Sequence, residues 1–495
     1  MNTKEIKFLL THSSIYGLGT MISRLISFLL LPLYTRYLNP EQYGVLETID
    51  ISNGIIGICV TVGIAMALSR FYYLSENEKE RKRVVSTALI TYLMISILVS
   101  PVLYFLSDPI SKLLFDSYKY GYYFKISFAA LIVGSVVDIG ATYLRLLKKP
   151  AFYITLTITR LFLLISLNIL FIVYFKLGIL GILYSSLIVR SLYCLIMFVL
   201  FIFKVGFKYD YKLSKEIIKY GLPIIPSKLA NMLVKQSDKY FVLAFISVAD
   251  MGIYSIALKI GNAVHTIITI PFNLAYIPRR FEIVKKKEAK SIYSEVFTYY
   301  IFVMGFIGIS LSLLIEDILK VMVTPEFYKA AEIIPLVVLS MIIFGAQYHF
   351  NFGILYSYKT SYLAKINFVC AIISLIGNYF LIRSFGIFGA VYSAIISLTT
   401  QAIFLYIISN KLYPIEFEFK RIALFGASSI SYFIICNSIN FKTLYINILF
   451  KITCTVIFPL LLYFTNIMSE KEKNGLKNFA KSIMMKINNK IDQDG

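Results

Sequence analysis

The 495-residue chain is 58% hydrophobic and only 15% charged, with a mean hydropathy of +0.75. This composition is too apolar for an ordinary soluble protein of this length and predicts an integral membrane protein. The formal net charge of +22 does not indicate nucleic-acid binding, because Lys and Arg are distributed over alternating connections between apolar segments and not over one soluble face.

A helix that crosses a bilayer needs about 20 apolar residues, and stretches of this kind recur along almost the whole chain. We predict an all-α polytopic protein with fourteen transmembrane helices. Residues 9–37 are too long for a signal-peptide core and read as the first permanent span. The fourteen approximate spans are 10–37, 43–73, 84–107, 122–147, 150–175, 178–203, 214–245, 251–280, 290–315, 329–358, 360–382, 385–410, 419–438 and 443–467.

The basic residues of the connections predict the orientation of the chain. The even-numbered connections hold about 21 Lys and Arg and the odd-numbered ones about 8, and a basic tail follows from Lys471 to Lys490. We expect the protein to span the cytoplasmic (inner) membrane. By the positive-inside rule, both termini are expected in the cytoplasm. An even number of spans, such as fourteen, satisfies this expectation.

An internal repeat is visible by eye. Residues 16–18 (YGL) and 23–25 (SRL) recur as 220–222 (YGL) and 227–229 (SKL), at an offset of 204 residues. Residues 178–185 match 386–393, and residues 43–45 roughly match 251–253, both at an offset of 208. Each copy holds six spans, so both enter the membrane in the same direction and are related by an axis along the membrane normal.

The repeat predicts four parts of the chain. They are an N-terminal six-helix lobe (1–205), a C-terminal six-helix lobe (206–412), an additional pair formed by spans thirteen and fourteen (413–470), and a basic cytoplasmic tail (471–495). The two lobes are expected to face each other across a cleft.

Polar side chains follow one face of the first and seventh spans at helical spacing. Thr20 and Arg24 lie on the first span, and Lys228, Asn231, Lys235 and Asp238 lie on the seventh. Span two adds Glu47 and Asp50, and span eight, its repeat partner, adds Lys259. These two repeat-related pairs of helices are expected to line the central cavity.

An ionised side chain costs roughly 2.5–3.5 kcal/mol at mid-bilayer, so these charges must meet water, each other or a ligand. Arg24 and Lys228, matched across the repeat, are predicted to bind ligand, together with Lys235, Lys259, Asn231 and Thr20. Glu47, Asp50 and Asp238 are candidates for ion pairing or for coupling to an ion. Asp238 could pair with Lys235, and Asp50 with a cation across the cleft.

Other polar features in the spans are weaker indications. The charged residues Asp138, Arg160, Arg190, Lys365 and Lys451 are expected to pair locally or to extend to the membrane surface. Pro223, Pro226 and Pro271 interrupt spans seven and eight and are candidate hinges, although a proline kink can also be static. The five cysteines lie in apolar segments without metal-ligand spacing, so no metal, disulfide or cofactor is predicted.

Several motifs resemble one family. The run 31–44 (LPLYTRYLNPEQYG) closes the first span, and 220–227 (YGLPIIPS), 237–240 (SDKY) and 252–255 (GIYS) follow in the second half. Together they resemble the bacterial polysaccharide-biosynthesis flippases of the Wzx type, over essentially residues 1–470. This family is part of the multidrug/oligosaccharidyl-lipid/polysaccharide exporter superfamily.

The resemblance implies two six-helix lobes, a central cavity and alternating access. It implies transport of an undecaprenyl-diphosphate-linked oligosaccharide to the outer leaflet, for O-antigen, capsule or exopolysaccharide synthesis. Arg24 and Lys228 are the positions that would receive the diphosphate. The implied partners are the polyprenyl-diphosphate-linked glycan, membrane lipid, a coupling ion such as H⁺ or Na⁺, and glycan polymerase or assembly proteins.

Two alternatives remain open. A multidrug exporter of the same superfamily would favour acids in the cavity, which the lysines oppose. A membrane-bound glycan polymerase or ligase would need a sizeable extracytoplasmic loop, and none is predicted. No DxD, HExxH, GxSxG or P-loop pattern with supporting context occurs, so we expect a transporter and not an enzyme.

Overall fold

The computed structural model describes residues 30–147, 149–439 and 443–464, together with residues 28, 441, 467, 470 and 473. None of these residues forms a β-strand, and nearly all of them are helical. The predicted all-α class is therefore confirmed.

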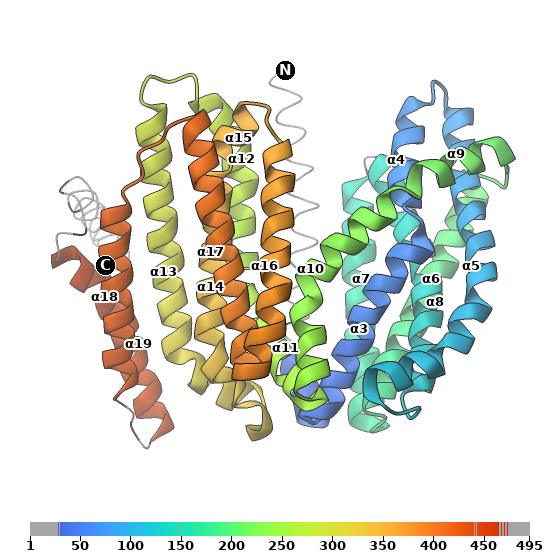
Figure 1. Cartoon of the computed structure of the whole chain (residues 1–495). Coiled ribbons are helices and arrows are strands. Elements are labelled where there is room, and N and C mark those ends of the chain that lie inside the picture. The colour runs from blue at the N-terminus through green and yellow to red at the C-terminus, as the bar shows by residue number, and fades with distance from the viewer. Residues whose placement is uncertain are drawn as a thin grey trace, which may run out of the picture. The chain divides into compact units, whose positions relative to one another are not determined.

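The first helices in chain order run from blue to green in Figure 1. They are α2 (Leu31–Tyr37), α3 (Pro40–Thr61), α4 (Ile64–Leu74), α5 (Glu78–Phe115), α6 (Gly121–Leu146), α7 (Pro150–Ile169) with the π-turn η1 (Leu170–Tyr174), α8 (Ile179–Lys204), α9 (Tyr211–Gly221), α10 (Ile224–Phe245) and α11 (Val248–Val264).

The remaining helices run from green to red. They are the π-turn η2 (His265–Thr269), α12 (Ile270–Ile283), α13 (Ala289–Met322), the short 3-10 helix η3 (Pro325–Phe327), α14 (Ala330–Phe350), α15 (Phe352–Tyr356), α16 (Ser361–Phe385), α17 (Ile387–Leu412), α18 (Phe419–Asn437) and α19 (Leu444–Phe464).

The described residues include twelve helical segments that are long and apolar enough to cross a membrane. Ten of them agree within about three residues with predicted spans, while Glu78–Phe115 and Ala289–Met322 extend up to eight residues beyond the predicted spans 84–107 and 290–315. α10 is not among them, because four charged side chains lie along its 22 residues. The predicted first span lies mostly outside the described residues. The count of fourteen is thus approximate, and the multi-pass membrane architecture is confirmed.

Several predicted spans are interrupted. The span 43–73 breaks where Val62 and Gly63 both adopt a left-handed conformation between α3 and α4. The span 214–245 divides into α9 and α10 at Leu222 and Pro223. In span 251–280 the π-turn η2 precedes Pro271, which lacks the amide needed for a regular helical hydrogen bond.

By their contacts the described residues form two compact units. Unit 1 comprises Met1–Thr266, Met322–Ile333 and Val369–Ser397, and unit 2 comprises Ile267–Val321, Ile334–Phe368 and Leu398–Gly495. The chain passes from unit 1 to unit 2 within η2. These units differ from the lobes 1–205 and 206–412, which were predicted from the repeat and stay a prediction.

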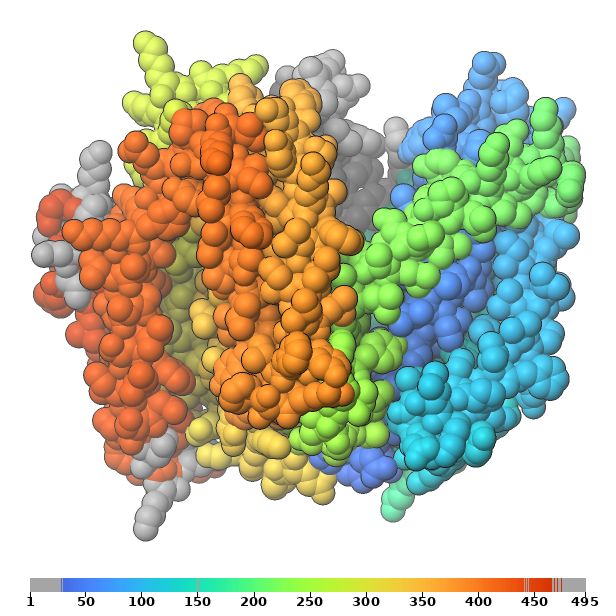
Figure 2. Space-filling model, viewed as in Figure 1, coloured from blue at the N-terminus to red at the C-terminus, as the bar shows by residue number. Residues whose placement is uncertain are grey.

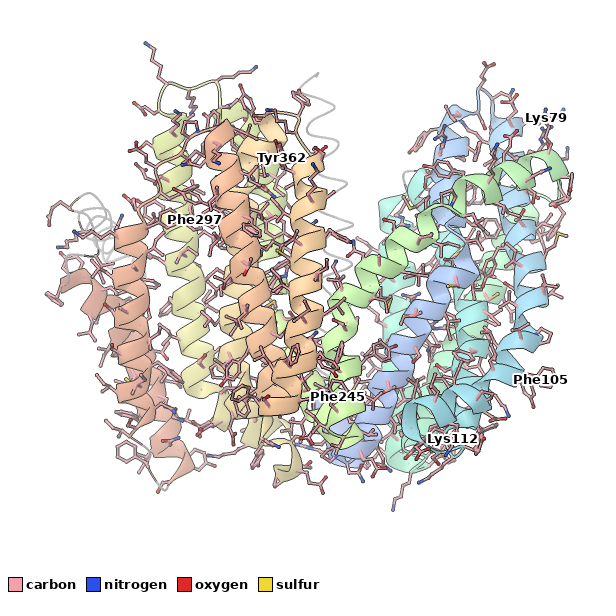
Figure 3. All side chains as sticks on the ribbon, in the orientation of Figure 1. Lys79, Phe105, Lys112, Phe245, Phe297 and Tyr362 are labelled. Carbon is pink, nitrogen blue, oxygen red and sulfur yellow. The ribbon has the colours of Figure 1, made fainter. Side chains whose placement is uncertain are left out.

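Within unit 1, α6 packs between α5 and α8, and α3 packs along α11 (Figure 1). α5 is the longest helix of this unit, and Figure 3 shows Lys79 and Lys112 at its opposite ends, with Phe105 between them. Phe105 is 74% exposed. A helix with an apolar exposed middle and basic ends fits a lipid-facing span.

The repeat is visible in the geometry of unit 1. The side chain of Asn39 caps α3 by accepting from the amide of Gln42, and that of Ser247 caps α11 by accepting from the amide of Asp250. Asn39 and Ser247 are 208 residues apart, and so are Gln42 and Asp250, which is the offset that the sequence predicts. Gly178 and Gly386, also 208 residues apart, both adopt a positive φ before α8 and α17.

The close approach of α3 and α11 depends on two glycines. A β-carbon on Gly44 would lie 1.9 Å from the carbonyl oxygen of Val248, and one on Gly252 would lie 2.2 Å from that of Pro40. Because Val248 and Gly252 are the repeat equivalents of Pro40 and Gly44, the two contacts are reciprocal. Such contacts are typical of a two-fold related interface.

The C-terminal helices α18 and α19 pack against α13 within unit 2. The rings of Phe302 and Phe425 lie 4.5 Å apart. The amine of Lys451, which is fully buried, lies 3.3 Å from Asp317. Lys451 therefore pairs locally, one of the two outcomes that the sequence left open. The outward faces of α18 and α19, red-orange in Figure 2, carry exposed apolar residues such as Leu449 that suit contact with lipid.

Candidate functional site

A cluster of charged groups joins three helices of unit 1. Glu47 lies one turn after Tyr43 on α3, Lys239 comes from α10 and Lys259 from α11. The Lys259 amine forms an ion pair with one carboxylate oxygen of Glu47 and donates to the hydroxyl of Tyr43 at 2.7 Å. The Lys239 amine lies 3.3 Å from the other oxygen of Glu47. We call these four residues the α3–α11 cluster.

The local sequence explains why the α3–α11 cluster forms. Gly44 and Gly252 allow the backbones of α3 and α11 to touch, so side chains one or two turns further along each helix meet. Only 6% of the Glu47 side chain and 12% of the Lys239 side chain are exposed, against 37% for Lys259. One carboxylate thus faces two ammonium groups, and the cluster keeps a net positive charge.

Asp238, the residue before Lys239, has a different partner. The hydroxyl of Tyr254 on α11 donates to one Asp238 oxygen at 2.7 Å, and the other oxygen is buried without a hydrogen-bond partner in the described part of the chain. The structure thus pairs Asp238 with Tyr254 and not with Lys235. One residue earlier, Asn378 of α16 donates to the hydroxyl of Ser237 at 3.1 Å.

The first half of α10 carries polar side chains of a different kind. Lys228, Asn231 and Lys235 are exposed, and their spacing places them on one face of the helix. Within the described residues none of the three side chains forms a hydrogen bond or an ion pair. Among the described residues, α10 therefore has amines without a partner toward its N-terminal half and partnered charges from Asp238 onward.

Asp50 follows Glu47 by one turn of α3. It is exposed and makes no hydrogen bond or ion pair with any described residue. Arg24, a candidate cation, lies outside the described residues, so the expected pairing of Asp50 with a cation stays a prediction.

The other predicted residues lie as follows. Pro223 sits in the turn between α9 and α10, Pro226 lies in the first turn of α10, and Pro271 is the second residue of α12. Thr20 and Arg24 lie outside the described residues. No group of three metal-ligating side chains occurs among the residues that the structure describes.

Sequence reasoning missed Lys239, Tyr43 and Tyr254 as members of the site. A signal was present, because Lys239 is spaced four residues from Lys235 and directly follows Asp238. Tyr43 is one helical turn before Glu47. What the sequence lacked was the pairing of α3 with α10 and α11, which is a tertiary contact.

The fold is similar to the folds of several solved membrane proteins. The structure is similar to that of the lipid II flippase MurJ in an inward closed conformation, with a TM-score of 0.66 and 15% identity, covering 90% of this chain and 98% of that chain. It is also similar to an inward-facing multidrug resistance MATE family transporter of the MOP superfamily, with a TM-score of 0.60 and 12% identity, covering 78% and 94%. At these identities the likeness shows the fold alone.

The sequence itself identifies the family. Residues 9–284 match the polysaccharide biosynthesis protein family, and the chain belongs to that family. The chain is also 27% identical over 294 residues to Lsg locus putative protein 1 of Haemophilus influenzae, covering 56% of this chain and 67% of that protein.

Proposed function

We propose that this protein is a flippase that moves an undecaprenyl-diphosphate-linked oligosaccharide from the inner to the outer leaflet of the cytoplasmic membrane by alternating access. Membership of the polysaccharide biosynthesis family and a fold like that of MurJ support this proposal. Both termini are then cytoplasmic, as the distribution of basic residues indicates.

The open amines of Lys228 and Lys235 carry the proposal. Each amine would cost roughly 2.5–3.5 kcal/mol at mid-bilayer without a counter-charge, yet no described carboxylate pairs with either. A diphosphate supplies several negative charges and many acceptor oxygens, so it can compensate for both. Asn231, between them, can donate to a phosphate or sugar oxygen.

The proposed substrate site is formed by side chains of α10 and of the predicted first span. Lys228, Asn231 and Lys235 contact the diphosphate and the first sugars, while the polyprenyl tail remains in lipid. Arg24, which matches Lys228 across the repeat, adds a bidentate phosphate contact, and Thr20 precedes it by four residues in the sequence. Lys259 is already paired with Glu47, so its role is to hold α3 and α11 together in this state.

Alternating access requires that some helix contacts break and others bend. The α3–α11 cluster joins helices from both repeats and is the contact that separates on opening. Pro223 and Pro271 lie at interruptions of their spans, and the chain changes from unit 1 to unit 2 just before Pro271, which supports bending there. Pro226 stiffens the first turn of α10.

Transport against a gradient needs a driving force, which a coupled ion can supply. Asp50 lies one turn after Glu47 and has no hydrogen-bond or ion-pair partner among the described residues, so it is our candidate for coupling to H⁺ or Na⁺. Glu47 and Asp238 are occupied by Lys259 and Tyr254, and would exchange those partners when the contact opens. Glycan polymerase or assembly proteins would consume the flipped product, whether O-antigen, capsule or exopolysaccharide.

An ion-coupled multidrug exporter is the second candidate, and the MATE fold favours it. A cationic drug, however, would be repelled by open lysines. A polymerase or ligase, the candidate from a different class, lacks support from any catalytic motif in the sequence.

A complementation experiment tests the proposal. In a strain that lacks its own copy of the gene, Lys228→Ala and Lys235→Ala should each reduce surface glycan strongly, and the arginine variants should retain it. Lys112→Ala, an exposed lysine at the far end of α5, serves as the matched control. Normal glycan in the double alanine variant, at normal protein level, would overturn the substrate site.

A further inference from the structure

The connection between α8 and α9 alternates basic and aromatic side chains. Residues 204–212 read KVGFKYDYK, and we call them the basic connection. Lys204, Lys208 and Lys212 recur every fourth residue and are all exposed. Between them Phe207, Tyr209 and Tyr211 are 51%, 42% and 73% exposed. Large exposed aromatic rings next to lysines are typical of segments at a membrane–water interface.

Hydrogen bonds fix the backbone of the basic connection on α5. The amide of Lys208 donates to the hydroxyl of Ser86 at 2.7 Å, and the amide of Asp210 donates to that of Thr87 at 3.3 Å. Just beyond, the hydroxyls of Ser214 and Thr91 lie 2.7 Å apart. The lysines are therefore presented from a fixed backbone and not from a free loop.

The single acidic side chain of the basic connection is already paired with a cation. Asp210, its one acid, lies 2.5 Å from Arg83 and accepts the amide of Leu213 as the cap of α9. The amines of Lys204, Lys208 and Lys212 form no hydrogen bond or ion pair within the described part of the chain. These three positive charges therefore have no partner among the residues that the structure describes.

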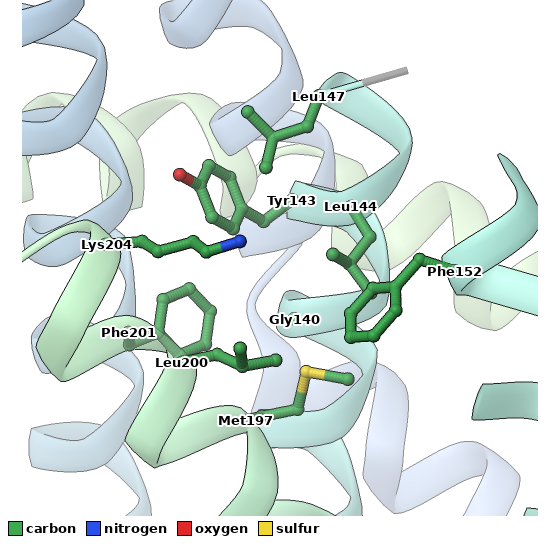
Figure 4. A pocket seen from close by; sticks show the side chains of 9 residues that line it. All are labelled: Gly140, Tyr143, Leu144, Leu147, Phe152, Met197, Leu200, Phe201 and Lys204. Carbon is green, nitrogen blue, oxygen red and sulfur yellow. The ribbon is translucent and has the colours of Figure 1, made fainter. Parts of the chain in front are cut away.

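A shallow apolar pocket adjoins the first of these lysines. Lys204 lies at its edge, alongside the rings of Tyr143 and Phe201, which stack 5.7 Å apart (Figure 4). The pocket lies between the ends of α6, α7 and α8, and its lining consists of Gly140, Tyr143, Leu144, Leu147, Phe152, Met197, Leu200, Phe201 and Lys204. A cation at the edge of an apolar surface suits a phosphate whose alkyl chain continues into the membrane.

We propose that the basic connection binds the phosphate of anionic phospholipids in the cytoplasmic leaflet. The inference rests on the orientation in the proposed function, since the basic connection follows a span end on the predicted cytoplasmic side. Polybasic segments gain roughly a fivefold affinity for an anionic surface per lysine, which corresponds to about 1 kcal/mol. The contact would anchor unit 1 at the surface of that leaflet.

The absence of tryptophan from the sequence allows a direct test. Tyr211→Trp places a single fluorophore on the basic connection, and Tyr358→Trp places one at a 93% exposed position after α15 as a control. The purified full chain in detergent is titrated with brominated phosphatidylglycerol or brominated phosphatidylcholine, and quenching is followed. Three lysines at about 1 kcal/mol each should favour the anionic lipid. We therefore expect phosphatidylglycerol to quench Tyr211→Trp at a concentration at least roughly tenfold lower than phosphatidylcholine.

Charge-matched variants decide between a specific site and general attraction. Lys204→Gln, Lys208→Gln and Lys212→Gln together should abolish the preference for phosphatidylglycerol in the Tyr211→Trp background. The control changes Lys285, Lys286 and Lys287 of the α12–α13 turn to Gln, which removes the same charge, and should preserve it. Equal quenching by both lipids, or equal loss in both triple variants, would overturn the proposal. Because no glycan lipid is present, failure here is distinct from failure of the flippase assignment.

Discussion

Glu47 and Lys259 form an ion pair between helices that the internal repeat relates to each other, α3 and α11. Lys239 shares the same carboxylate from α10. Removing Glu47 would leave two ammonium groups without a counter-charge, whereas removing Lys259 would leave Glu47 paired with Lys239. Loss of Glu47 is therefore expected to lower the unfolding free energy more than loss of Lys259, and this difference can be measured.

Glu47→Leu should lower the unfolding free energy by about 3 kcal/mol, because breaking a buried pair leaves uncompensated charge. Lys259→Met should cost clearly less. The double variant should lose less than the sum of the two single changes. Thermal or denaturant unfolding in detergent measures all three, and additivity within about 0.5 kcal/mol would contradict a direct interaction.

Gly44→Ala should disrupt the contact of α3 with α11, because the new methyl group would lie 1.9 Å from the Val248 carbonyl oxygen. Gly252→Ala should have a similar effect through the carbonyl of Pro40. Gly426→Ala in α18 is the matched control, since a β-carbon there meets no atom within 4 Å. That control should be neutral or stabilising by up to about 1 kcal/mol. Equal melting temperatures for Gly44→Ala and the wild-type protein would refute the close contact.

The reciprocal contact of Gly44 and Gly252 is a feature that the sequence could predict. The offset of 208 residues by itself relates Gly44 to Gly252, and glycine in an apolar helix indicates a close approach. Hydropathy also located twelve spans. It did not find the break at Val62 and Gly63, because two left-handed residues leave the apolar pattern unchanged.

Partners of charged residues were harder to predict. α10 offers three lysines and one aspartate along one stripe, and spacing alone allowed pairing within that helix, as between Lys235 and Asp238. The structure instead pairs Asp238 with Tyr254 and Lys239 with Glu47, both on other helices. Such pairing depends on how helices pack, which one sequence does not reveal.

Asp317→Leu should destabilise the docking of α19 on α13, because it leaves the fully buried amine of Lys451 without its nearest carboxylate. Breaking such a pair costs about 3–5 kcal/mol, whereas replacing both partners by apolar residues is often close to neutral. The double variant Asp317→Leu with Lys451→Met should therefore recover part of the loss, because the Asn447 amide, which donates to both Asp317 oxygens, still loses its acceptor.

Thiol labelling reports on this docking. Cys436 of α18 and Cys454 of α19 are buried beside Leu313 of α13. They should react with a membrane-permeant maleimide at lower temperature in Asp317→Leu than in the wild-type protein or the double variant. Identical labelling curves for the single and double variants would show that the ion pair does not hold the helices.

Asp50→Asn should uncouple transport from its driving ion while leaving the fold intact, because the carboxylate has no partner among the described residues to lose. We expect at least a tenfold slower gradient-driven flux with an unchanged melting temperature. A flux assay under imposed H⁺ or Na⁺ gradients measures this. Wild-type flux in Asp50→Asn under both gradients would remove Asp50 as the coupling residue.

The most direct measurement is translocation of a fluorescent polyprenyl-diphosphate oligosaccharide in proteoliposomes, read by the fraction that becomes accessible to an impermeant quencher. The account predicts transport by the wild-type protein and by Lys228→Arg, and its loss in the double variant Lys228→Ala with Lys235→Ala. It also predicts competition by an unlabelled diphosphate lipid and none by a cationic drug. Full transport by the double alanine variant, or competition by the cationic drug alone, would contradict it.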